Sequence, residues 1–177
     1  MKLLLKAITP ILVVMVTCSA CLVPPYPKDP RFATFTYETD ESVKVQERVD
    51  SFNGRIPKLG ATEGHVVVAR FRDGSWIPAP DYQYWLTGVA TVPDTTTTLL
   101  VDNSADGSSL LPGIHPILYE YVPEECSFTT VDPTVANTIL GTDQNDIYSE
   151  WGSFTITAFA VSADCNLIIV TGDGINA

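Results

Sequence analysis

From residue 32 onward, apolar and polar positions alternate in short segments with a period of two. This alternation is typical of β-strands, in which successive side chains point to opposite faces of a sheet. It predicts strands at residues 32–37, 43–49, 65–71, 82–92, 95–103, 108–111, 115–122, 127–131, 152–161 and 166–172. Residues 43–49 also fit a short helix, because Ser42 could cap it and Val45 and Val49 are four positions apart.

Turn signals separate these segments every 8–15 residues, for example Asp73-Gly74 and Asp106-Gly107. Asp-Gly is a favoured dipeptide in tight hairpin turns. No segment carries an apolar stripe through three helical turns. The pattern therefore predicts an all-β fold, an antiparallel β-sandwich, with a small lipocalin-like β-barrel as the alternative.

Residues 1–20 have the layout of a secretory signal peptide: a basic start, a short apolar run and small residues at the end. Ser19-Ala20 before Cys21 resembles the cleavage box of bacterial lipoproteins, although Cys18 stands where that motif usually has Leu. We therefore expect export, with a lipid on Cys21 that holds the chain to a membrane. Simple cleavage after Ala20 and an uncleaved anchor are the alternatives.

The segment that follows, residues 21–31, contains four prolines within residues 22–31. Such a stretch favours extended polyproline geometry rather than pairing in a sheet. We interpret it as a tether between the lipid and a single all-β domain at residues 32–177.

Cysteine positions are consistent with this reading. Cleavage before Cys21 removes Cys18, and lipid attachment occupies Cys21, which leaves Cys126 and Cys165. Outside the cytoplasm an even pair is expected to form a disulfide. Both residues follow or precede expected strands, so we predict a bridge between them. Two buried free thiols are the alternative.

Charge narrows the range of partners. The 177 residues carry a formal net charge of −11, and removal of residues 1–20 takes away two Lys and changes it to −13. A surface this acidic repels phosphate groups, which argues against nucleic-acid binding.

The sequence shows none of the motifs of common catalytic sites. There is no GxSxG, no GxGxxG after a strand and no glycine-rich phosphate loop. His65 and His115 lie outside any recognisable catalytic motif. We therefore expect a protein that is not an enzyme, with no cofactor and no metal.

Asp102, Ser104 and Asp106, followed by Gly107, match the first half of a calcium loop. The second half does not fit, because Gly113 stands where a bidentate Glu is needed. The preferred interpretation is a hairpin turn, and a weak cation site is the alternative.

Aromatic side chains gather at Trp76, Tyr82, Tyr84 and Trp85. If exposed, they would form a surface for a sugar or a protein partner. If buried, they belong to the core of the sheet. Tyr82 and Tyr84 fall on one face of the expected strand and Trp85 on the other, so we expect at least one side to be interior.

Three segments in this order carry a family resemblance: DGSW at 73–76, GIHPILYEY at 113–121, and WGSFTITAF at 151–159 with CNLIIVTG after it. The arrangement resembles envelope lipoproteins of unknown function from Bacteroidota-type bacteria, over about residues 65–174. The sequence departs from that pattern at His115 and at 171–173, where the family has aromatic residues. The resemblance implies an all-β lipoprotein domain and brings no catalytic residue with it.

Together these features predict an exported, lipid-anchored envelope protein that acts as a non-enzymatic binding or structural module. Its partner would be another envelope protein or a glycan. A secreted carbohydrate-binding or carbohydrate-active β-sandwich is the alternative, and a small-ligand carrier is a third hypothesis.

Overall fold

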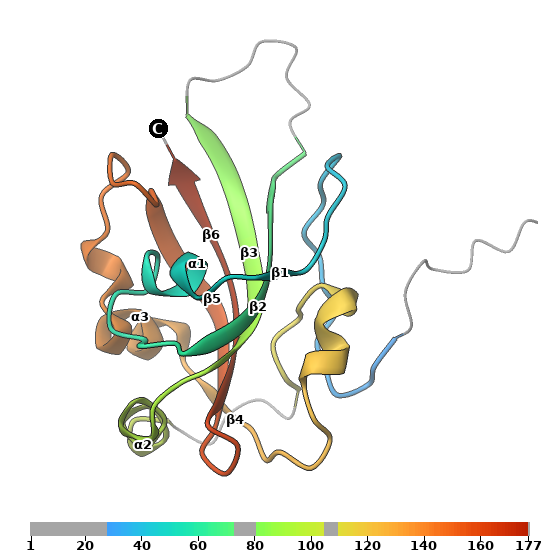
Figure 1. The fold of residues 1–177 in the computed structure, drawn as a ribbon, viewed down its shortest axis with the longest axis vertical. Coiled ribbons are helices and arrows are strands. Elements are labelled where there is room, and N and C mark those ends of the chain that lie inside the picture. The colour runs from blue at the N-terminus through green and yellow to red at the C-terminus, as the bar shows by residue number, and fades with distance from the viewer. Residues whose placement is uncertain (1–27, 73–80, 105–109, 177) are drawn as a thin grey trace, which may run out of the picture.

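The computed structural model describes residues 28–72, 81–104 and 110–176. In these residues six strands form one antiparallel sheet in the order β1-β2-β3-β6-β5-β4 (Figure 1). The strands are β1 (Gln46–Glu47), β2 (Glu63–Arg70), β3 (Tyr82–Thr91), β4 (Thr129–Val131), β5 (Ser153–Ser162) and β6 (Leu167–Asn176). The helices are α1 (Val49–Asn53), α2 (Asp94–Asp102), α3 (Pro133–Leu140) and the 3-10 helices η1 (Pro116–Tyr121) and η2 (Thr142–Gln144).

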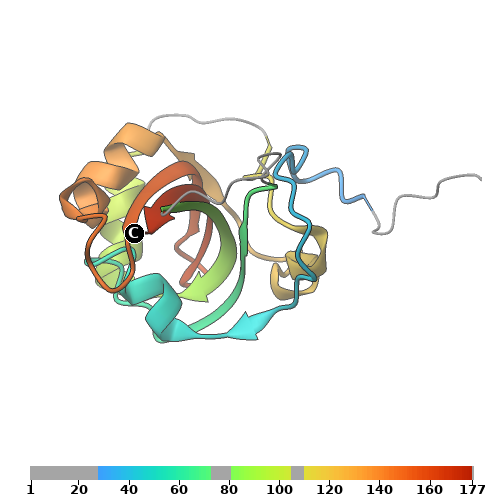
Figure 2. The same ribbon diagram turned by 90° about the horizontal axis from the view of Figure 1, so that it is seen from above.

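The centre of the sheet is the pair β3 and β6, which align over ten residues from Tyr82 opposite Asn176 to Thr91 opposite Leu167. Figure 2 shows that the sheet is strongly curved. Helices α1, α2 and α3 lie on one side of it, which we call the helix face (Figure 2). Residues 28–45, which we call the strap, lie with η1 on the other side, the strap face (Figure 2).

Both faces of the sheet are buried, because the central strands carry apolar side chains at both sets of alternating positions. In β3, Tyr84 and Leu86 belong to the core of the helix face, whereas Trp85 and Val89 belong to the core of the strap face. The helix-face core takes Phe52 from α1, Leu100 from α2 and Leu140 from α3, as well as strand residues. The strap-face core takes Phe32, Ile114, Leu118 and Val122 from outside the strands.

The predicted antiparallel all-β fold is confirmed. The fold is sandwich-like because apolar layers pack against a sheet, but in the described residues those layers are helices and extended segments rather than a second sheet. The lipocalin-like barrel is not formed, since β1 and β4 lie at opposite edges of an open sheet.

Several expected strands are different elements. Residues 95–103 are expected as a strand but lie mostly in helix α2, which begins directly after Pro93. Residues 115–122 are expected as a strand but contain η1, with Pro116 in its first turn and His115 as its N-cap. Proline in the first turn favours η1, because its fixed φ is already helical and its missing N–H would have had no partner there. Pro93 is the extended N-cap that precedes α2.

The two N-terminal segments also differ from expectation. Residues 32–37 form no strand, and only Phe32 makes an isolated bridge, with Leu111. Residues 43–49 divide between the two alternatives, because Gln46–Glu47 form β1 and a helix begins at Val49. The strap therefore packs on the sheet mainly through side-chain contacts rather than through backbone pairing.

The predicted disulfide is confirmed. Cys126 and Cys165 are bonded, with Cα atoms 5.8 Å apart. The bridge joins the connection before β4 to the turn between β5 and β6. Ser127 strengthens the junction, because its backbone N–H donates to the carboxylate of Asp164 at 3.1 Å.

None of the helices in the described part of the chain is long and apolar enough to cross a membrane. The predicted signal peptide and lipidation site at Cys21, with most of the tether, lie outside the described residues.

Candidate functional site

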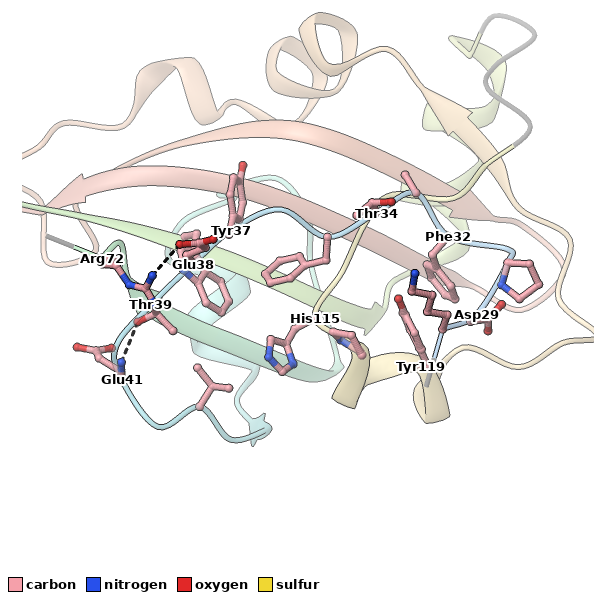
Figure 3. A pocket seen from close by; sticks show the side chains of 17 residues that line it. Asp29, Phe32, Thr34, Tyr37, Glu38, Thr39, Glu41, Arg72, His115 and Tyr119 are labelled. Atoms are coloured by element: carbon pink, nitrogen blue, oxygen red, sulfur yellow. Dashed lines mark hydrogen bonds and ion pairs between the residues drawn. The ribbon is translucent and has the colours of Figure 1, made fainter. Parts of the chain in front are cut away.

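The strap face carries a pocket of about 950 Å³. The strap frames it along one side and turns back around it near Thr39, and η1 closes another side (Figure 3). The lining residues are Lys28, Asp29, Pro30, Phe32, Ala33, Thr34, Phe35, Tyr37, Glu38, Thr39, Glu41, Val43, Arg72, Trp85, His115, Pro116 and Tyr119. The pocket therefore combines residues from the start, the middle and the third quarter of the chain.

Three rings form the inner part of the pocket. Phe35 packs edge-on against Trp85, with ring centroids 5.3 Å apart, and against His115 at 5.4 Å. Trp85 and His115 lie parallel, with centroids 6.2 Å apart. Edge-to-face and offset contacts at these distances are favourable because the positive ring edge meets the negative ring face. The floor is therefore a pre-formed aromatic surface.

Trp85 is fully buried, because the alternation of β3 points it to the strap face beneath Phe35. Its indole Nε1 is buried and has no hydrogen-bond acceptor among the described residues. A buried donor without an acceptor costs roughly 1–3 kcal/mol.

His115 is held by backbone contacts at the start of η1. The imidazole Nδ1 of His115 accepts a hydrogen bond from the backbone N–H of Ile117 at 3.4 Å. The backbone N–H of His115 donates to Thr87 Oγ1 at 3.3 Å. Burial lowers the pKa of His115 below the usual 6.5. The imidazole is therefore neutral at neutral pH and adds a polar but uncharged ring to the pocket.

The two ends of the pocket are also aromatic. Phe32 stacks on Tyr119 of η1 with centroids 4.5 Å apart. At the other end Tyr37 packs edge-on against Phe71 at 5.2 Å, and its hydroxyl is 3.0 Å from Thr157 Oγ1. Burial raises the pKa of Tyr37, so its hydroxyl stays protonated.

Charged residues at the rim are paired with one another. Arg72 contacts Glu38 at 2.9 Å and Asp40 at 2.7 Å. At the opposite end Asp29 pairs with Arg31 at 2.8 Å. The hydrogen bond from Arg31 lowers the pKa of Asp29, which therefore remains ionised. The two pairs of Arg72 connect the strap to the segment that follows β2, whereas the pair of Asp29 and Arg31 lies within the strap.

The described members of the aromatic cluster predicted from sequence are divided between the two faces of the sheet. Tyr84 lies in the helix-face core, where its hydroxyl donates to the carbonyl of Ser153 at 2.9 Å, and Tyr82 packs against the same core. Trp85 lies on the strap face and lines the pocket. Trp76 lies outside the described residues. The expectation that these residues divide between two faces is confirmed, and both of those faces are interior.

The weak cation candidate is not assembled in the described residues. Asp102 is the last residue of α2 rather than part of a hairpin, and Ser104 Oγ donates to the carbonyl of Val101. Asp106 lies outside the described residues. Among the residues that are described, no three or more His, Cys, Asp or Glu side chains are placed to hold a metal ion.

Sequence reasoning assigned no binding role to most of the pocket. The rings of Phe32, Phe35 and Tyr37 were expected in a strand, and Tyr119 in another. The signal that could have singled them out is the density of rings in FATFTY directly after the proline-rich segment. A sequence cannot show that this segment crosses the face that carries Trp85.

Comparison with known proteins found no match to a protein-family model, a curated protein or a solved structure.

Proposed function

We propose that this protein is an exported, lipid-anchored binding module, and that the aromatic pocket of the strap face is its ligand site. The observation that carries the proposal is the pocket itself, a space of about 950 Å³ with an aromatic floor. Small-molecule sites typically measure about 300–1,000 Å³ and are lined by apolar and aromatic side chains with a few polar groups. The pocket has both properties.

The ligand that suits this pocket is uncharged and has a flat apolar face. Rings of Phe35, Tyr37 and Tyr119 line the pocket and offer faces and edges for stacking. The rim carboxylates Glu38 and Asp29 are already paired with arginines. A charged ligand would have to compete with these pairs, whereas a neutral ring leaves them intact.

A neutral apolar fluorophore, N-phenyl-1-naphthylamine, tests the site. We expect a saturable increase in fluorescence at one probe per protein. Phe35→Ala removes a ring that contacts both Trp85 and His115 and should weaken binding about tenfold. Tyr148→Ala is the matched control, because Tyr148 is 81% exposed and lies away from the pocket. Equal affinity in wild type and Phe35→Ala would rule out this pocket as the probe site.

Lipid anchoring at Cys21 is part of the same proposal, because the proline-rich tether of residues 21–31 runs into the strap, with residues 28–31 common to both. Intact-mass analysis of the membrane fraction tests it. We expect a chain that begins at Cys21 and carries added acyl mass. A different first residue, or an unmodified Cys21, would contradict it.

Carbohydrate binding is a second candidate, favoured by one feature of the rim. Arg72, Glu38 and Glu41 line the same pocket as Tyr37, and sugars need both a ring to stack on and polar partners. A glycan array separates the two candidates. Binding of a defined glycan that is lost in Tyr37→Ala and kept in Tyr148→Ala would favour the sugar.

We further propose that the protein performs no catalytic turnover. Screening with ester, glycoside, peptide and phosphate substrates should give background rates only. A reproducible activity that disappears on changing a single acidic residue, such as Asp143 or Glu125, would overturn this.

A further inference from the structure

A second, smaller cavity lies on the helix face, around the side chain of Arg55. Arg55 follows helix α1, and its backbone N–H donates to the carbonyl of Phe52 at 3.1 Å. This turn directs the side chain under the helix layer, where the residue is only 8% exposed. A guanidinium remains charged at any physiological pH, so its burial requires compensation.

The partners of Arg55 among the described residues are all neutral. Its Nε donates to the hydroxyl of Tyr84 at 3.2 Å, and its Nη1 donates to the carbonyl of Ser51 at 3.1 Å. The guanidinium also lies 4.9 Å from the ring centroids of Tyr84 and Trp151. These contacts use two of its five N–H donors, and no carboxylate of the described residues forms an ion pair with it.

Arg55 lines a cavity of about 170 Å³ next to this site. Arg70 lines it as well, with its guanidinium 4.2 Å from the ring of Tyr82, and Glu41 lies 3.9 Å from Arg70 Nε. The ionised groups lining the cavity are these two arginines and Glu41, which leaves one positive charge in excess. Val68 and the rings of Tyr82 and Tyr84 supply the apolar part of the wall.

We infer that this cavity binds the carboxylate of a small organic acid, with Arg55 as its main partner. The planar fork of a guanidinium matches the two oxygens of a carboxylate. The cavity admits a short acid, and its apolar wall suits a hydrocarbon stub better than the fully polar surface of inorganic phosphate. The cavity shares Glu41 with the lining of the aromatic pocket, but Arg55 and Arg70 line only the cavity. The inference does not depend on the function proposed for the aromatic pocket.

Thermal unfolding of the mature chain with sodium propionate tests the inference, with sodium chloride and sodium phosphate at equal ionic strength and pH 7 as comparisons. We expect propionate to raise the melting temperature in a saturable way, beyond the effect of either salt. Saturation-transfer NMR on propionate, read at its methyl group, should show contact with the protein.

Substitutions then locate the site. Arg55→Lys keeps the charge but loses the fork, and should weaken the propionate effect about tenfold, whereas Arg55→Met should abolish it. Arg48→Met is the matched control: Arg48 also lies over the ring of Trp151, at 5.7 Å, but its side chain is 47% exposed. This control should respond to propionate as wild type does.

If Arg55→Met does not fold, Arg70→Met decides the matter. The Arg70 side chain is 61% exposed, so its loss should spare the fold and weaken propionate binding several-fold. The inference would be overturned if propionate stabilised the protein no more than chloride, or if phosphate stabilised it as much as propionate. A full response to propionate in both Arg55→Lys and Arg70→Met would overturn it as well. The fluorophore titration of the aromatic pocket should be unchanged in the Arg55 variants, because Arg55 does not line that pocket. Failure of one site is therefore distinguishable from failure of the other.

Discussion

At the scale of single residues, Phe52 of helix α1 packs closely against the sheet. Its ring occupies space that two glycines leave open on neighbouring strands. A Cβ on Gly88 would lie 2.4 Å from Phe52 Cζ, and a Cβ on Gly64 would lie 2.5 Å from Cε2. Interiors packed this closely have no room for an added methyl group. These glycines let helix α1 approach the sheet.

The first prediction follows from this contact. Gly88→Ala should lower the free energy of unfolding by about 1–3 kcal/mol, because the added methyl group overpacks the core. Urea denaturation measures the loss. In the background Phe52→Leu the smaller side chain makes room, so the double variant should lose less than the sum of the two single variants. Strictly additive losses would show that the contact is not responsible.

The second prediction concerns His115. Burial lowers its pKa in the folded state below 6.5, so the unfolded chain takes up a proton first as the pH falls. The stability that comes from keeping the ring neutral is therefore present above pH 6.5 and is lost progressively below it. Denaturation at pH 7.5 and at pH 5.5 should show a smaller decline in His115→Asn than in wild type. Equal declines would contradict a role for His115.

At the scale of elements, helix α2 shows tertiary structure prevailing over local propensity. Its four consecutive threonines favour a strand, because β-branched side chains are restricted in a helix. The helix forms because Pro93 starts it and because Asp94, in its first turn, accepts a hydrogen bond from Asn166 Nδ2 at 2.7 Å. Leu100 then reaches the core of the helix face.

Two adjacent leucines of this helix provide the third prediction. Leu100 is fully buried, whereas Leu99 is 49% exposed. Leu100→Ala should cost about 2–5 kcal/mol of unfolding free energy through the cavity it leaves. Leu99→Ala, the same chemical change one position earlier, should stay within about 0.5 kcal/mol of wild type. Similar losses in both variants would place the helix differently on the sheet.

Helix α3 was not expected at all, although its sequence carries recognisable end signals. The carboxylate of Asp132 accepts hydrogen bonds from the N–H groups of Thr134 and Val135, Pro133 occupies the first turn, and Gly141 ends the helix with φ of 75°. These three signals mark a helix start and stop. The short length of the helix hid its periodicity, but its caps were readable.

At the scale of the whole molecule, one sheet holds two cores, and the disulfide ties the connection before β4 to the last hairpin. The bridge between Cys126 and Cys165 spans a sequence separation of 39 residues. In the chain-entropy model, closing a loop of this length restricts the unfolded state by roughly 4 kcal/mol. Both cores are extensive, so the fold should persist without the bridge.

The fourth prediction is that reduction lowers the melting temperature by roughly 10 °C without abolishing the cooperative transition. Thermal unfolding followed by circular dichroism, with and without a phosphine reductant, measures the difference. The double variant Cys126→Ser/Cys165→Ser should melt at the lower temperature and ignore the reductant. Thiol labelling at both positions in unfolded, unreduced protein would contradict the bridge.

The sequence by itself determined the properties that depend on local pattern. Alternation located β2, β3, β5 and β6, because successive side chains of a strand point to opposite faces of the sheet. The same alternation separated Tyr84 from Trp85. Cysteine parity predicted the disulfide pair once export, cleavage before Cys21 and lipid attachment at Cys21 were assumed.

Only the tertiary structure decided which segments cover the sheet. FATFTY has the alternation of a strand, but it lies over the strap face as an extended segment with a single bridge, and its rings meet Trp85 and His115 there. Likewise, the sequence around Arg55 does not reveal that its charge is buried beside a cavity. Both sites are formed by residues far apart in the chain, and contacts of that kind leave no periodic signal within either segment.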